Sequence, residues 1–143
     1  MNAVVAVALI VLGAGPSRTY VRVSAEFVAP VKPGANAHVA VTLTPRDADV
    51  RVNEEPGPRL KLDADEAVLV DKQAPPPRFT AYDPENARYL DPALPVHIAV
   101  AVKPSAPRGR QTVKAGLTYF YCSKREGWCR KGNEDVEFPV VVP

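Results

Sequence analysis

Apolar and polar residues alternate over several short stretches of the chain. Within residues 20–27, apolar side chains from Val21 to Phe27 occupy the odd positions and polar ones lie between them. Residues 37–44 and 96–102 alternate in the same way. A period of two places successive side chains on opposite faces of a β-strand, so each stretch predicts a strand with one face turned toward a core.

Clusters of Pro, Gly and Asp separate these stretches from others of the same kind. The pattern indicates roughly eight short strands, spaced about eight to twelve residues apart, with almost no helical periodicity. It therefore predicts an all-β fold, an antiparallel β-sandwich. The further predicted strands span residues 50–53, 59–63, 67–70, 112–121 and the region around 136–138.

Length and charge narrow the class of protein. The chain has 143 residues, with 18 Lys and Arg against 16 Asp and Glu, which is a formal charge of +2. One domain with one core fits this length. The basic residues are spread along the chain without the clustered face that nucleic-acid binding needs, so we expect no nucleic-acid partner. The chain also contains no Gly-x-Ser-x-Gly, no phosphate-binding glycine loop and no His-Glu-x-x-His.

The N-terminus carries a continuous apolar run over residues 3–12, followed by small residues up to Gly15. About ten residues are too few to cross a bilayer as a helix, but they match the hydrophobic part of a signal peptide. A buried first strand is the alternative. We expect residues 1–15 to be a signal peptide, residues 16–143 to be the mature domain without a membrane span, and the protein to be periplasmic or secreted.

The two cysteines of the chain, Cys122 and Cys129, flank a polar segment that contains one glycine. An aromatic run precedes this segment and residues 136–138 follow it, a pattern typical of a β-hairpin. Cysteines near the two bases of such a turn can face each other across antiparallel strands at disulfide distance. Three roles remain open from the spacing: a static disulfide worth about 2–3 kcal/mol, a redox-active pair, or part of a metal site.

Cationic side chains surround the two cysteines. They are Lys124, Arg125, Arg130 and Lys131. Positive charge favours a thiolate over a thiol and so favours the redox role, although Glu126 offsets part of it. We expect Trp128 to pack in the core, and shielding of the sulfurs is the more specific alternative.

The C-terminal third resembles a known family. Residues 94–98, 117–122 and 128–129 are similar to the N-terminal domain of the thiol:disulfide interchange protein DsbD and its free-standing relatives. The resemblance implies an immunoglobulin-like sandwich in which Cys122 and Cys129 exchange electrons with thioredoxin-like or other periplasmic redox proteins. Here six residues separate the cysteines instead of the family's five, and Arg130-Lys131-Gly132 replaces its aromatic-Pro-Pro.

Two further features are candidates for the same site. Residues 79–90 lack regular periodicity and carry aromatic and acidic side chains, so the resemblance makes them the candidate for a loop that caps the cysteines. Sequential strands usually pair, so we expect residues 95–102 and 112–121 to be neighbours, which would bring His97 near Cys122. Two Cys and one His leave a zinc site one ligand short. We expect His38 to face solvent, and we expect no metal and no cofactor.

The sequence therefore predicts an exported thiol:disulfide interchange module that works through Cys122 and Cys129. The alternative is a structural or protein-binding sandwich whose disulfide never turns over.

Overall fold

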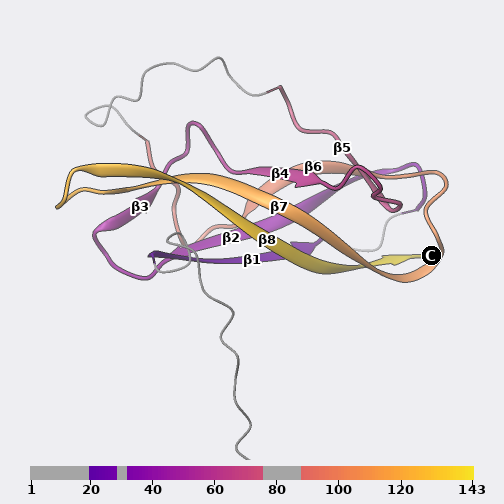
Figure 1. The fold of residues 1–143 in the computed structure, drawn as a ribbon. Helices are drawn as coiled ribbons and strands as arrows, with labels where there is room; N and C mark the ends of the chain where they lie inside the picture. The colour runs from indigo at the N-terminus through magenta and orange to yellow at the C-terminus, as the bar shows by residue number, and fades with distance from the viewer. Residues whose placement is uncertain (1–19, 29–31, 76–87) are drawn as a thin grey trace, which may run out of the picture.

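The computed structural model of the protein describes residues 20–28, 32–75 and 88–143, which form eight β-strands (Figure 1). The strands are β1 (Val21–Phe27), β2 (Asn36–Pro45), β3 (Val50–Val52), β4 (Arg59–Leu62), β5 (Leu69–Asp71), β6 (Val96–Val102), β7 (Gly109–Ser123) and β8 (Trp128–Val142). The strands form two antiparallel sheets. Sheet A has the order β1-β2-β6-β5. In sheet B, β8 lies along one side of β7 while β3 and β4 follow one another along its other side.

The core lies between the two sheets, as the alternating pattern requires. In β2 the odd positions from 37 to 43 are buried and the even positions are exposed or half-buried, and β7 and β8 alternate in the same manner over most of their length. Side chains from both sheets form one buried cluster, which includes Val39, Val41, Ile98, Val100, Val113, Leu117, Tyr119, Phe138 and Val140. The predicted all-β sandwich is confirmed.

The hairpin of β7 and β8 is the longest element of the fold. Its register runs without a break from the pair Gly109 and Val142 to the pair Ser123 and Trp128. Figure 1 shows the two strands, in orange and yellow, side by side across the whole molecule, with their connecting turn at the left edge. Near this end Gly132 lies opposite Tyr119, and a Cβ on Gly132 would come within 2.5 Å of the Tyr119 ring. The glycine therefore allows the ring to lie across the neighbouring strand.

One predicted pairing is wrong. The strands that begin at Val96 and Gly109 are consecutive, but β6 belongs to sheet A and β7 to sheet B. Both edges of β6 are already occupied, by β2 and β5. The intervening segment contains Pro104 and Pro107, which lack the N–H that a ladder needs, and it carries the chain from one sheet to the other.

The N-terminal prediction lies outside the described residues, since residues 1–15 are not among them. Among the residues that the structure does describe, none belong to a helix long and apolar enough to cross a membrane.

Candidate functional site

Cys122 and Cys129 form a disulfide at the end of the β7–β8 hairpin. They are directly opposite each other in the register, with Cα atoms 4.1 Å apart and an S–S distance of 2.24 Å. The pair is one step before the last pair of the ladder, and a four-residue turn from Lys124 to Gly127 closes the hairpin beyond it. Gly127 has a φ of 71°, in the left-handed region that glycine enters without strain. The predicted hairpin and disulfide are confirmed.

The disulfide lies on the outer face of sheet B, away from the core. Along β7 the odd positions, including Tyr119 and Tyr121, point into the sandwich, so Cys122 points outward, and Cys129 shares its face. The two sulfur-bearing residues differ in exposure. Cys122 is 3% exposed, whereas Cys129 is exposed. Of the two cysteines, only Cys129 is therefore open to solvent.

Asn53 is the polar neighbour of the buried sulfur. Its Oδ1 lies 3.3 Å from Cys122 Sγ, and the residue is only 1% exposed. Asn53 directly follows β3, and its backbone N–H donates to the Phe120 carbonyl over 2.8 Å. A disulfide sulfur carries no proton, so the contact becomes a hydrogen bond only when Cys122 is reduced and its S–H can donate.

The end of the predicted cap loop lies beside Asn53. Residues 79–87 are outside the described part of the chain, but Tyr89 forms an isolated antiparallel bridge with Asn53. Leu90 N–H donates to the Val52 carbonyl over 2.8 Å, which extends the sheet past β3. Lys124 Nζ lies 5.4 Å from the centroid of the Tyr89 ring, so the turn of the hairpin contacts this segment as well.

A carboxylate from the β2–β3 connection fixes the turn. Asp49 accepts hydrogen bonds from the Ser123 hydroxyl and from the Arg125 backbone N–H, the latter over 2.7 Å. The Ser123 Oγ in turn accepts from Glu126 N–H over 3.1 Å. These bonds favour the charged carboxylate, with the Ser123 bond as the largest cause, and lower the pKa of Asp49 below its usual value of 3.8.

The cations near the disulfide are divided between the two faces of the hairpin. Lys131 shares the outer face with Cys129, and Arg51 of β3 lies directly opposite Cys122. Arg130 has the opposite orientation, and its guanidinium carbon lies 4.1 Å from the Trp128 ring centroid. Trp128 packs edge-on against Tyr121, with centroids 5.7 Å apart, so it joins the core-side aromatic residues. Burial of Tyr121 raises the pKa of its phenol, which stays protonated.

His97 lies away from the disulfide, because β6 belongs to sheet A. It is on the outer face of that sheet, where its ring centroid is 6.0 Å from that of His38, and both are exposed. The expected proximity of His97 to Cys122 is therefore wrong, while His38 faces solvent as predicted. Among the described residues, no three of His, Cys, Asp and Glu come together as a metal site.

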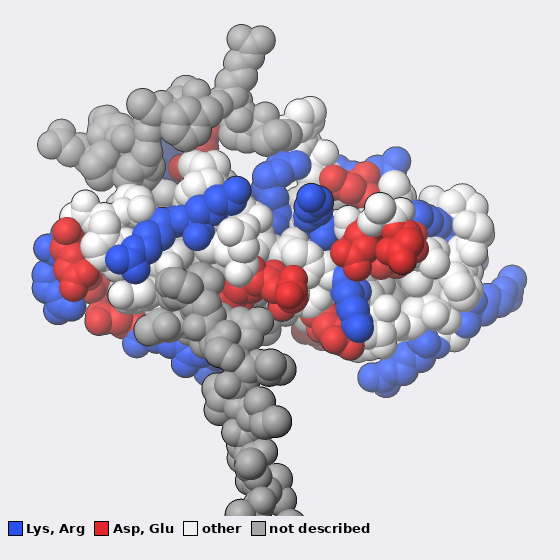
Figure 2. All heavy atoms as spheres, in the orientation of Figure 1, with Lys and Arg blue, Asp and Glu red and all other residues white. Residues whose placement is uncertain are grey.

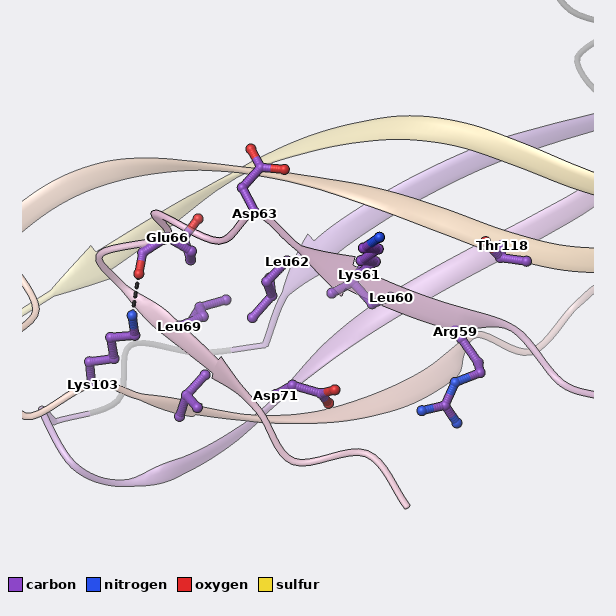
Figure 3. A pocket seen from close by; sticks show the side chains of 11 residues that line it. Arg59, Leu60, Lys61, Leu62, Asp63, Glu66, Leu69, Asp71, Lys103 and Thr118 are labelled. Carbon is purple, nitrogen blue, oxygen red and sulfur yellow. Dashed lines mark hydrogen bonds between the residues drawn. The ribbon is translucent and has the colours of Figure 1, made fainter. Parts of the chain in front are cut away.

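A groove of about 500 Å³ lies elsewhere, between β4 and β5 (Figure 3). Lys61, Leu62, Glu66 and Lys103 are among its lining residues. Comparisons of the chain with family models, with curated proteins and with solved structures gave no match.

Proposed function

We propose that the protein is an exported, immunoglobulin-like thiol:disulfide interchange domain that acts through Cys122 and Cys129. The observation that carries the proposal is the unequal exposure of the two cysteines, 3% for Cys122 against an exposed Cys129. Exchange needs one sulfur that a partner can reach and a second one held beside it. A disulfide on the outer face at the end of a hairpin meets both needs.

The exposed residue is the one that exchanges. In the reduced protein the Cys129 thiolate attacks a partner disulfide, forms a mixed disulfide and releases one partner sulfur as a thiolate. The Cys122 thiolate then attacks Cys129 Sγ, which restores the intramolecular disulfide and releases the second partner sulfur. Two electrons pass to the partner, and the two protons from the cysteines are available to its two thiolates. In the oxidised protein a partner dithiol attacks Cys129 Sγ and the steps run in reverse.

Asn53 gives the buried sulfur a hydrogen-bond partner in this cycle. Its Oδ1 is placed to accept from the Cys122 thiol, and the amino group of the same amide can donate to the thiolate after rotation of the side chain. Without such a partner, a thiolate at a residue only 3% exposed would be strongly disfavoured by desolvation. The amide therefore makes Cys122 a workable leaving group.

A static disulfide is the second candidate, and the hairpin itself argues against it. Closing a loop this short stabilises a protein by about 2–3 kcal/mol in the chain-entropy model. However, the strands are already joined along an unbroken ladder, and Asp49 ties down the turn through Ser123 and Arg125. The hairpin therefore has other means of holding its end closed.

The partner class and the location follow from the same chemistry. Disulfides persist in oxidising compartments, which supports a periplasmic or secreted protein. Partners would be proteins with an accessible cysteine pair, of the thioredoxin-like or a related kind, in line with the resemblance of residues 94–129 to the interchange family.

The reduction potential of the disulfide tests the proposal. We expect a reduction potential of about −200 mV, measured by equilibration in glutathione buffers and alkylation of the free thiols. Such a pair exchanges under the conditions of an oxidising compartment. A value below about −300 mV, typical of structural disulfides, would contradict the proposal and leave the static alternative.

Serine variants test which sulfur exchanges. Cys122→Ser keeps the exposed thiol, so it should form a stable mixed disulfide with bis(2-hydroxyethyl) disulfide, detected by mass spectrometry. Cys129→Ser keeps only the buried thiol and should react at least about tenfold more slowly. Equal rates in two variants with the same circular-dichroism spectrum would contradict the assignment.

A further inference from the structure

We propose that the partner surface carries carboxylates beside its reactive cysteine, and that Arg51 and Lys131 select it. This inference rests on the proposed function and names the chemistry of the partner. Arg51 lies directly across the strand pair from Cys122, and Lys131 is the next outward residue after Cys129 along β8. Both side chains are exposed, so they flank the disulfide on two sides of one face.

The acidic residues near the hairpin end lie mostly in other places. Asp49 is engaged with Ser123 and Arg125, and Glu126 accepts from the Trp128 indole N–H over 2.5 Å. Both bind groups at the turn. The next acid on the outer face of β8 is Asp135, six residues beyond Cys129. Glu54 and Glu55 belong to the segment that leaves the sheet between β3 and β4.

Among the described residues, the charged side chains next to the disulfide on this outer face are therefore cationic. The end of the hairpin as a whole carries both signs, and Asp47 there lies 3.9 Å from the Arg125 guanidinium. Figure 2 shows Lys and Arg side chains over the hairpin end, at the left, with acidic side chains beside them. The same outer face offers an apolar contact, because Phe120 is half-buried and lies directly opposite Lys131. A partner docking on Cys129 would cover Phe120 and place its own rim against Arg51 and Lys131.

Charge of this kind acts first on the rate of encounter. Complementary charges at a rim raise association rates and disfavour like-charged partners, and salt weakens both effects. Arg51 and Lys131 also bear on Cys129 itself, since cations favour its thiolate. The test must separate the selection of a partner from this change in reactivity.

Three peptide disulfides make that separation. Each is a symmetric dimer of a short peptide with one cysteine, flanked on both sides by Glu, by Gln or by Lys. Rates of reaction with the reduced protein give a ratio of the Glu probe to the Lys probe. A change in the pKa of Cys129 alters all rates alike and leaves that ratio unchanged. We expect a ratio above one that falls roughly tenfold in Arg51→Glu/Lys131→Glu and falls in the wild type as salt is added.

A matched variant on the same face controls for total charge. Arg110 and Lys114 point outward from the far half of β7, and both are exposed. Arg110→Glu/Lys114→Glu makes the same change in net charge and should leave the ratio as in the wild type. Equal falls in the two double variants, or a wild-type ratio of one or below, would overturn the inference.

The uncharged probe tells the two proposals apart. If the Gln probe reacts but the ratio of the charged probes does not depend on Arg51 and Lys131, the exchange function stands and the partner chemistry is wrong. If no probe reacts with the reduced wild-type protein, the exchange function fails and the inference fails with it.

Discussion

The disulfide end of the hairpin and the groove between β4 and β5 differ in shape and in the chemistry of the groups that line them. The groove has a volume of about 500 Å³, and two of its lining residues, Lys103 and Leu60, are bonded to groups inside the protein. Lys103 Nζ donates to the Glu66 backbone carbonyl, drawn as a dashed line in Figure 3. The Gln73 amide donates to Leu60 O over 2.7 Å and accepts from Leu60 N–H over 2.9 Å.

The disulfide end has the opposite character. There Cys129 is exposed on the outer face of the sheet, and the Asn53 amide lies beside the buried Cys122 sulfur. Beside the groove, the Gln73 amide bonds to the backbone N–H and C=O of Leu60 in β4 of sheet B. These backbone groups are therefore not available to pair with a strand of another chain. The comparison teaches that in this fold an exposed cysteine of a disulfide, and not a cavity, marks the candidate site.

Replacement of Asn53 is the strongest test of whether its amide stabilises the reduced form of the disulfide end. Asn53→Ala removes a hydrogen bond that the Cys122 thiol makes only in the reduced protein, so the reduced form loses about 1.4 kcal/mol and the reduction potential falls by about 30 mV. Equilibration with glutathione measures the shift. Asn133→Ala is the matched control, because Asn133 accepts from Thr118 Oγ1 over 3.0 Å on the same face. Equal shifts in the two variants would remove the role of Asn53.

Replacement of Gln73 tests the hydrogen bonds at the edge of the groove, because Gln73 bonds to the lining residue Leu60. Gln73→Ala breaks both bonds to Leu60 and should lower the free energy of unfolding by about 1 kcal/mol without moving the reduction potential. Urea denaturation of the oxidised protein measures the first effect. Gln111→Ala, which loses one exposed bond to the Arg108 carbonyl, should change stability by less than about 0.5 kcal/mol. A shift in the potential of Gln73→Ala would break the separation of the two regions.

The smallest expected effect is at the turn of the hairpin. The pKa of Asp49 is lowered in the folded protein, so its charged form contributes stability at pH values above its usual pKa of 3.8. That contribution is lost as the pH falls through the folded pKa. Asp49→Asn should therefore lower the denaturation midpoint at pH 7, and the difference from the wild type should shrink below about pH 4. Asp135→Asn, which removes an exposed carboxylate from β8, is the control. A pH-independent difference would contradict this role of Asp49.

The sequence allowed the local part of the site to be predicted, and the reason is its short range. Cys122 and Cys129 are separated by seven positions, and a polar segment with Gly127 between two β-rich arms suffices to bring them together. The alternation of side chains likewise identified the core-facing positions. Both signals depend on neighbours in the chain, which a sequence shows directly.

The long-range part could not be predicted in the same way. Asn53 is 69 positions from Cys122, and its place depends on β3 pairing with the last residues of β7. Nothing in residues 50–53 specifies that strand as partner. The misplaced His97 has a related cause, because the rule that sequential strands pair takes no account of a crossing from one sheet to the other.

The unbroken register of the hairpin ties the position of the two cysteines to the packing of the core. The alignment that places Phe138 against Val113 inside the sandwich is the one that places Cys129 against Cys122 on its outside. A slip of one residue would turn every side chain of β8 to the opposite face. The core packing of the hairpin thus sets the register of its disulfide end. A change in the length of the turn that shifted this register would separate the two sulfurs without replacing either cysteine.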